Sequence, residues 1–255
     1  MADYFIDDST LTGIADAIRT KSGSNDEILV SDMANTIENM ELLVDYENTK
    51  ATSVVDYAFY GFDRLKSASF PNVTSIGNSA FYNCFKLKQI NLPNVTSIGK
   101  SAFNSYKYTG VLEVYSNLIE NMNFPLVTSI GENAFSNCVH LKNIQIPLVT
   151  TLNKNTFYGC DSLEFIELPS VTSMYTHAIA YCDNLKTIVL SANTVCDPTY
   201  NVNNASMSSI YGCPNLESIY VPDSLVESYK SNTRWSRYLS YIKPLSEYTG
   251  GDSSV

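Results

Sequence analysis

The sequence predicts a solenoid of short parallel β-strands, in which one structural unit repeats along a single axis. Three observations support this prediction. Near-identical segments recur along the chain, the usual step between them is 22 residues, and each copy carries apolar residues at the same places. Fixed periods of this length are typical of proteins in which each unit contacts only its neighbours.

The repeated unit is clearest in the segment PNVTSIGNSAFYNCFKLKQINL, which begins at Pro71. Related segments follow at steps of 22, 32, 22 and 22 residues and begin at Pro93, Pro125, Pro147 and Pro169. An earlier copy starts at Ala51 and a degenerate later copy ends near Val221, which gives seven units. The extra residues in the longer units, around 106–115 and 196–207, are expected to leave the stack as loops.

Within one unit, the apolar residues are expected to point into a shared core. In the unit that begins at Pro71 they are Val73, Ile76, Ala80, Phe81, Cys84, Leu87, Ile90 and Leu92. The last part reads LxxIxL, which is the strand signature of leucine-rich repeats. Because side chains alternate along a strand, Ile90 and Leu92 are expected inside and Gln89 and Asn91 outside.

The remaining parts of the unit predict turns and a second short strand. The VTSIG segment favours a short strand that ends in a bend at Gly77. The SAFYNC segment is too short for a full helix, so we expect a 3₁₀ turn there. Pro71 and its equivalents end each strand, where no donor for the ladder is required. A lone unit cannot bury its apolar face, so stability is expected only in the stack.

Five of the six cysteines fall in one column of the repeat, namely Cys84, Cys138, Cys160, Cys182 and Cys213. Phe62 and Tyr106 take the equivalent place in two other units, which indicates an apolar packing site. The chain lacks CxxC and Cys/His spacings, so buried free thiols are expected rather than a metal site or disulfides. Cys196 lies outside this column, in the irregular last unit, where it could be exposed.

The repeated elements VTSIG, AF, a Cys three positions later and LxxIxLP resemble the BspA-like family of bacterial leucine-rich repeats. The resemblance covers about residues 51–221 and implies a leucine-rich-repeat solenoid. Members of this family are mostly surface or secreted proteins that bind components of host or neighbouring cells. The family pattern contains no catalytic residues, so the resemblance implies a binding protein and gives no residue a catalytic role.

The two ends of the chain are predicted to form small helical caps around a solenoid at 46–221. Residues 1–45 contain two amphipathic segments, 10–21 and 31–40, that predict a helical hairpin. This hairpin resembles N-terminal segments of predicted tail proteins of phages and prophages of gut bacteria, which implies attachment to a virion. A cap over the first repeat is the alternative, and the two roles are compatible. Residues 222–246 are expected to form the other cap, with Trp235 covering the last repeat, and 247–255 a disordered tail.

Composition excludes several classes of function. The net charge is −10, and residues 1–48 carry −9 of it, so no basic patch for nucleic acid is expected. No apolar run is long enough to span a membrane, and the N-terminus does not resemble a secretory signal. His140 and His177 occupy non-equivalent places, and no phosphate loop or recurrent carboxylate pair occurs. No catalytic group, metal or cofactor is therefore expected.

The outward strand positions form the candidate binding surface. They are polar amides in the first units and become more apolar and aromatic towards the C-terminus. The predicted contact residues are Gln89, Asn91, Asn143, Gln145, Phe165, Glu167, Val189 and Tyr220. A second column of tyrosines, Tyr60, Tyr82, Tyr158 and Tyr211, is a further candidate, because tyrosine is favoured at recognition surfaces.

Together these features predict a non-catalytic binding or adhesion protein whose partner is a protein or glycan on a cell surface. The hairpin favours a phage or prophage tail protein that recognises a bacterial host and contacts other virion proteins. The expected location is the virion or an extracellular surface after cytosolic synthesis. The alternatives are a bacterial adhesin exported by a non-classical route and a purely structural virion or scaffold component.

Overall fold

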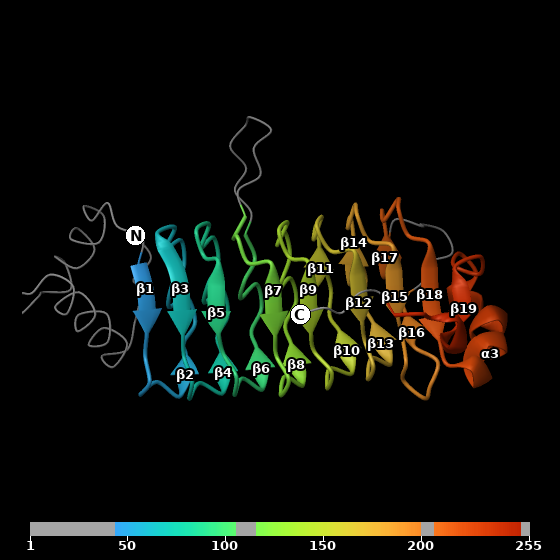
Figure 1. The fold of residues 1–255 in the computed structure, drawn as a ribbon, viewed down its shortest axis with the longest axis horizontal. Helices are drawn as coiled ribbons and strands as arrows, with labels where there is room; N and C mark the ends of the chain where they lie inside the picture. The colour runs from blue at the N-terminus through green and yellow to red at the C-terminus, as the bar shows by residue number, and fades with distance from the viewer. Residues whose placement is uncertain (1–43, 106–115, 200–206, 251–255) are drawn as a thin grey trace, which may run out of the picture.

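The computed structural model describes residues 44–105, 116–199 and 207–250. The predicted helices at 10–21 and 31–40 therefore lie outside the described residues, as does the insertion at 106–115. The described chain winds into one elongated solenoid, with parallel strands stacked along its long axis (Figure 1). The predicted leucine-rich-repeat solenoid is thus confirmed, and β1 and β19 extend its main strand column beyond the predicted units.

The main column of strands forms one long face of the solenoid (Figure 1). Its members are β1 (Val44–Glu47), β3 (Leu65–Ser69), β5 (Gln89–Asn91), β7 (Asn121–Asn123), β9 (Asn143–Gln145), β12 (Phe165–Glu167), β15 (Thr187–Val189), β18 (Ser218–Val221) and β19 (Ile242–Pro244). Hydrogen-bonded ladders join β1-β3-β5, β7-β9 and β12-β15-β18-β19, so the column consists of three separate sheets. We call this column the strand face.

A second column of two-residue strands runs along an edge of the solenoid and is formed by the VTSI segments. It contains β2 (Ser53–Val54), β4 (Ser75–Ile76), β6 (Ser97–Ile98), β8 (Ser129–Ile130), β10 (Thr151–Leu152), β13 (Ser173–Met174) and β16 (Asp197–Pro198). Equivalent serines pair with each other, for example Ser75 with Ser97. The predicted second strand is therefore confirmed.

The SAFYNC segment does not form the predicted 3₁₀ turn. Successive turns cover it, and in the later units it forms the short strands β11 (Phe157–Tyr158), β14 (Ile179–Ala180) and β17 (Ile210–Tyr211). The reason lies in the backbone: Ser79 and Asn83 have φ angles of 53° and 59°, in the left-handed region. Two left-handed residues so close together interrupt any right-handed helix.

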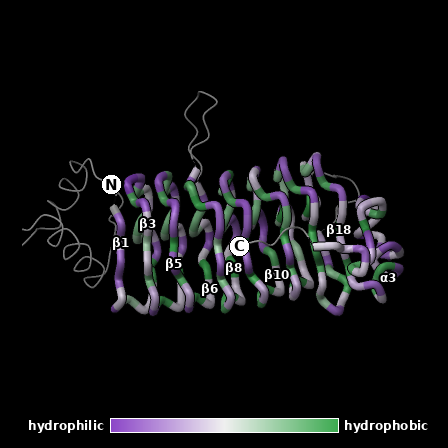
Figure 2. Tube along the Cα trace, viewed as in Figure 1, coloured by the Kyte–Doolittle hydropathy of each residue, from purple (hydrophilic) through white to green (hydrophobic). Residues whose placement is uncertain are grey.

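The core is a set of ladders of identical side chains. Phe59, Phe81, Phe103, Phe135 and Phe157 stack nearly parallel, with ring centroids 5.2–5.6 Å apart. The predicted inward residues Val73, Ile76 and Leu87 are fully or almost fully buried. Green apolar and purple polar positions alternate along the tube at each turn (Figure 2). Each unit therefore buries its apolar side chains against its neighbours, as the repeat predicts.

The cysteine column is part of this core. Cys84, Cys138, Cys160 and Cys182 are buried and Cys213 is half-buried, and all are free thiols. Each fully buried thiol of the column donates to the carbonyl oxygen of a phenylalanine in the preceding unit, as Cys84 does to Phe59 over 3.1 Å. The prediction of buried free thiols is confirmed for this column. The expected exposure of Cys196 is wrong, because the C-terminal cap covers it.

The C-terminal cap is short and only partly helical. It contains the 3₁₀ turns η2 (Asp223–Leu225), η3 (Thr233–Trp235) and η4 (Leu245–Glu247). It also contains the short helix α3 (Val226–Ser231). Trp235 is fully buried and its indole Nε1 donates to the Cys196 carbonyl oxygen over 2.8 Å, which confirms its predicted role. Strand β19 rather than a helix follows Trp235, and Leu239 between them is exposed. No helix in the described ranges is long and apolar enough to cross a membrane.

Glycines allow the units to approach each other at the end of the second column. A Cβ atom added at Gly99 would lie 2.6 Å from the backbone carbon of Gly77, and one at Gly131 would lie 2.5 Å from the Lys100 nitrogen. The next equivalent residue is Asn153, and no ladder joins β8 to β10 there. Instead, the Asn153 side-chain amide donates to the Ile130 carbonyl oxygen, as the Gly131 backbone does to Ile98.

The substitution Gly99→Ala should therefore destabilise the stack by about 1–3 kcal/mol, the usual cost of overpacking a tight contact. Chemical denaturation followed by circular dichroism measures this change. The neighbouring exposed residue supplies the control, since Lys100→Ala removes only a surface ion pair of 3.5 Å and should change stability by less than about 1 kcal/mol. Equal effects of the two substitutions would contradict the close approach at Gly99.

Candidate binding surface

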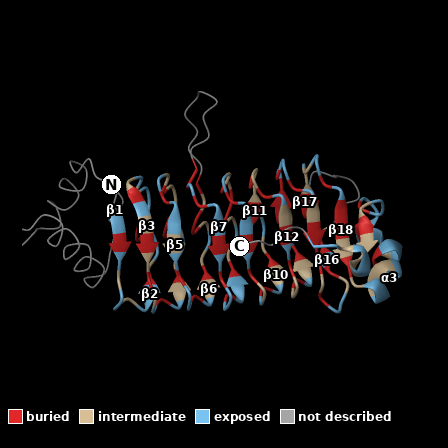
Figure 3. Cartoon of the chain, viewed as in Figure 1, coloured by how far each residue is buried: buried red, intermediate tan, exposed pale blue. Residues whose placement is uncertain are grey.

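The strand face carries its outward side chains in straight rows, because equivalent residues of neighbouring strands are in register. Ser67 pairs with Gln89 and Ser69 with Asn91, and Asn121 pairs with Asn143 and Asn123 with Gln145. Figure 3 shows exposed positions alternating with buried ones along these strands. Gln89, Asn91, Asn143, Gln145 and Glu167 are exposed, so the structure places these five predicted contact residues at the surface.

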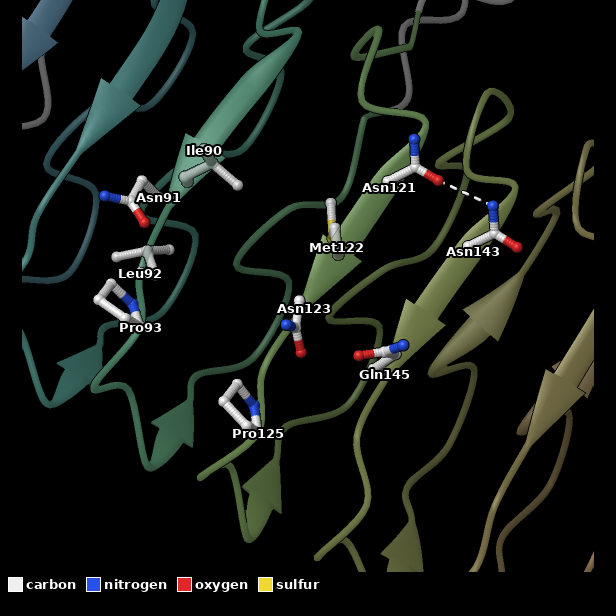
Figure 4. A pocket seen from close by; sticks show the side chains of 10 residues that line it. All are labelled: Ile90, Asn91, Leu92, Pro93, Asn121, Met122, Asn123, Pro125, Asn143 and Gln145. Atoms are coloured by element: carbon white, nitrogen blue, oxygen red, sulfur yellow. Dashed lines mark hydrogen bonds between the residues drawn. The ribbon is translucent and has the colours of Figure 1, made fainter. Parts of the chain in front are cut away.

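Amide side chains dominate the central part of this face. The Asn143 amide nitrogen donates to the Asn121 carbonyl oxygen over 2.8 Å (Figure 4), and Asn91 donates to the Ser69 hydroxyl over 3.2 Å. These hydrogen bonds orient the amides side by side along the row. Because each amide has both donors and acceptors, the row retains capacity for further hydrogen bonds to a partner.

Charged groups flank this row as ion pairs between neighbouring units. Lys142 lies 2.9 Å from Glu120 and Lys186 lies 2.8 Å from Glu164, in both cases between exposed side chains. Hydrogen bonding to Lys142 lowers the pKa of Glu120, so the pair stays ionised near neutral pH. Mutual neutralisation leaves the surface beside the amides without a strong field of one sign, which disfavours partners that bind through charge alone.

A hollow of about 310 Å³ interrupts the amide row between β5 and β7. In Figure 4, β5 and β7 lie farther apart than β7 and β9. The residues that line it are Ile90, Asn91, Leu92, Pro93, Asn121, Met122, Asn123, Pro125, Asn143 and Gln145. Three predicted contact residues, Asn91, Asn143 and Gln145, thus meet at one concave site. We call this hollow the β5–β7 groove.

The predicted contact residues Phe165, Val189 and Tyr220 are less exposed than expected. Val189 was expected outside, but it is 1% exposed, because the C-terminal segment crosses this part of the strand face. The ring of Tyr248 stacks parallel on Phe165 with centroids 5.8 Å apart and contacts Tyr220 at 5.0 Å. Phe165 and Tyr220 are consequently only partly exposed.

This crossing was not predicted, because Tyr248 lies in the segment that was expected to be a disordered tail. Lys243 strengthens the attachment, since its Nζ donates to the Ser218 hydroxyl over 2.6 Å and lies 5.9 Å from the Tyr220 ring. The Asp223 carboxylate accepts from the Ser246 backbone nitrogen over 2.9 Å. The predicted contact residues thus separate into an open amide region and an aromatic region covered by the chain itself.

The second tyrosine column forms two clusters, one on the turns and one around strands β11 and β17. Tyr60 is exposed and stacks on Tyr82 with centroids 5.0 Å apart. Tyr158 and Tyr211 belong to a cluster with His177 and Tyr181, in which Tyr158 and Tyr181 lie 4.9 Å apart. His177 and Tyr181 both have positive φ angles, which bulky residues rarely adopt. The sequence predicted the tyrosine column but not its clustering with His177.

The family model for the BspA-type leucine-rich-repeat region matches residues 37–119 and 112–233, in six copies. The chain belongs to the BspA-type leucine-rich-repeat family. Members of this family are typically extracellular or surface-associated, and their solenoid is typically a binding scaffold without enzymatic activity. No curated protein sequence matches the chain.

Solved structures of bacterial leucine-rich-repeat proteins are similar to this chain. The T. pallidum leucine-rich-repeat protein is 27% identical, with a TM-score of 0.53, over 76% of this chain and 78% of that protein. A leucine-rich cell-surface protein from Faecalibacterium prausnitzii is 19% identical, with a TM-score of 0.31, over 80% of this chain and 84% of that protein. The first of these similarities supports the leucine-rich-repeat solenoid fold.

The described parts of this BspA-type chain contain no assembled metal centre. There, no group of three or more His, Cys, Asp or Glu side chains is placed to hold a metal ion. His140 is exposed on a turn, and His177 is packed among tyrosines. The cysteines lie in the core rather than on the strand face.

The cysteine column predicts a selective pattern of alkylation. Burial raises the pKa of Cys138 and of Cys196 to about 12, whereas a hydrogen bond with the Cys182 thiol lowers the pKa of the half-buried Cys213. Because the thiolate is the nucleophile, iodoacetamide at pH 8 should modify Cys213 much faster than the other five. Peptide mass spectrometry of native and denatured protein measures this. If Cys138 and Cys213 were alkylated at the same rate in the native protein, the burial of Cys138 in the core would be contradicted.

The cover over the aromatic region predicts a stability effect at Tyr248. Replacing it with Ser removes two ring contacts and should lower the free energy of unfolding by about 1–2 kcal/mol. Thermal and chemical unfolding measure the loss. The control is Tyr175→Ser, because Tyr175 is 52% exposed and should contribute less than about 0.5 kcal/mol. If the two variants unfold alike, Tyr248 does not cover Phe165 and Tyr220 in solution.

Proposed function

We propose that this protein is a non-catalytic recognition protein that binds a protein or glycan on a bacterial cell surface through the strand face. The observation that carries the proposal is the row of exposed amides that meets at the β5–β7 groove. A concave site with convergent polar groups over apolar residues is the usual form of a binding site. The family to which the chain belongs supplies the second support, because its solenoids typically serve as binding scaffolds.

The proposal includes a place for the protein on the tail of a phage or prophage. Its support is the resemblance of residues 1–45 to N-terminal segments of predicted tail proteins. In this proposal, residues 1–45 contact other virion proteins and the solenoid contacts the host. A bacterial adhesin exported by a non-classical route would use the same strand face, and a purely structural virion component would not need it.

The first experiment applies the fluorescently labelled full chain to a panel of intact bacterial cells. We expect saturable binding to some of them. Combined replacement of Asn91, Asn143 and Gln145 by Ala should weaken this binding at least about tenfold, since each lost polar contact is worth on the order of 1 kcal/mol. Flow cytometry at increasing protein concentration measures the affinity, and circular dichroism verifies folding.

The matched control removes three amides that lie away from the strand face. Asn72, Asn94 and Asn215 are exposed and donate to backbone carbonyl oxygens of the preceding units. Their combined replacement by Ala should leave binding unchanged. Absence of binding to every cell, together with incorporation of the full chain into particles, would replace the proposal by the structural alternative. Equal losses of binding in both triple variants would show that the strand face is not the binding surface.

A further inference from the structure

The β5–β7 groove arises from a local divergence of two units that are joined on both sides of it. At one side, the Leu118 backbone nitrogen donates to the Leu87 carbonyl oxygen over 2.8 Å. At the other, the Thr128 nitrogen donates to the Thr96 carbonyl oxygen over 2.9 Å, and β6 pairs with β8. Between these bonds, residues 88–95 face residues 119–127, which form a segment one residue longer. No ladder joins β5 to β7 between these bonds.

Backbone groups that pair elsewhere in the column lack their partners in this groove. The residue after each strand normally donates to the next unit: Phe70 donates to the Asn91 carbonyl oxygen and Phe124 to that of Gln145, both over 2.9 Å. The equivalent bond would join the Leu92 nitrogen to the Asn123 oxygen, and within the described chain neither group has a hydrogen-bond partner. Because unpaired backbone groups are costly unless water or a ligand satisfies them, this groove offers one donor and one acceptor at facing edges.

The lining favours a peptide over other ligands. It contains five amide side chains, the apolar residues Ile90, Leu92 and Met122, and two prolines, but no charged residue. The lining lacks the Arg and Lys side chains that usually recognise phosphate or carboxylate groups. It also contains no aromatic ring on which a sugar would stack. Amides together with strand edges match the alternating donors and acceptors of an extended polypeptide backbone.

We propose that the β5–β7 groove binds an extended, uncharged segment of a partner protein by strand addition. About three residues of this segment, which span roughly 10 Å, would lie between β5 and β7. Its backbone satisfies the Leu92 nitrogen and the Asn123 oxygen, and Asn91, Asn143 and Gln145 hold its outward polar groups. Pro93 and Pro125 end the site on one side, because neither offers an N–H group. This inference rests on the proposed function and names the class of partner.

The test selects ligands for the labelled full chain from a yeast-displayed library of linear ten-residue peptides that lack charged residues. We expect enriched peptides that bind the full chain and bind the Asn123→Tyr variant at least about tenfold more weakly, because the tyrosine side chain fills the groove. The control is Glu47→Tyr, which places the same side chain at the equivalent register position on β1, outside the groove. This control should bind as the unchanged protein does.

A second measurement does not depend on any protein variant. Each residue of a selected peptide is N-methylated in turn, which removes one backbone donor. A strand-added peptide should lose at least about tenfold in affinity when the residue whose backbone nitrogen donates to the Asn123 carbonyl oxygen is N-methylated, because that methyl group removes the donor and blocks the strand edge. Tolerance of N-methylation at every position would overturn strand addition, even if the Asn123→Tyr variant failed to fold.

The remaining outcomes separate this inference from the proposed function. If cells bind the full chain and the Asn123→Tyr variant equally, the groove is not the contact, whereas recognition by another part of the strand face stands. If no peptide is enriched and an array of bacterial glycans binds in a manner sensitive to Asn123→Tyr, the groove takes a saccharide and the peptide inference is overturned. If peptides bind in the groove but no cell does, strand addition holds and cell-surface recognition fails.

Discussion

The structure depends on backbone hydrogen bonds between equivalent residues of neighbouring units. Phe59, Phe81 and Phe103 each donate to an alanine carbonyl oxygen of the next unit over 2.7–2.8 Å. This pairing holds the units at strand spacing, which in turn stacks the phenylalanine rings and buries the cysteines. Glycines at 77, 99 and 131 permit the close approach, and left-handed residues such as Ser79 and Asn83 let each unit close within 22 residues. The ladder of the strand face is interrupted between β9 and β12 and between β5 and β7, and at β5 and β7 the joining segments also differ by one residue in length.

Most of the fold could be predicted from the sequence because it is encoded locally and repeatedly. The period placed Phe81, Cys84 and Leu87 in the core, and the alternation along the strand placed Gln89 and Asn91 outside. Backbone conformation within the unit was harder to predict. The left-handed angles at Ser79 and Asn83 follow from close packing between units, and a single unit read alone suggests a 3₁₀ turn instead.

The candidate site could be predicted only where it depends on one strand and its neighbours. The amides of Asn143 and Gln145 lie where the alternation along the strand puts them. Val189, in contrast, is buried, and Phe165 is covered by a segment about 60 to 80 residues away in the sequence. The repeat period does not encode such a long-range contact. The β5–β7 groove also escaped prediction. It lies where the segments that join two units differ by one residue in length, and this difference becomes visible only when the hydrogen bonds are known.

The central claim is that the strand face opens between β5 and β7 while the units stay paired on both sides. Residue-resolved amide hydrogen exchange of the full chain, followed by NMR, tests it most directly. The amides of Phe70, Phe124 and Thr128 should exchange slowly, because each donates to a neighbouring unit. The amide of Leu92 should exchange at least about a hundredfold faster, since it faces the groove without an acceptor. Protection of Leu92 equal to that of Phe124 would show a continuous ladder and would contradict the account.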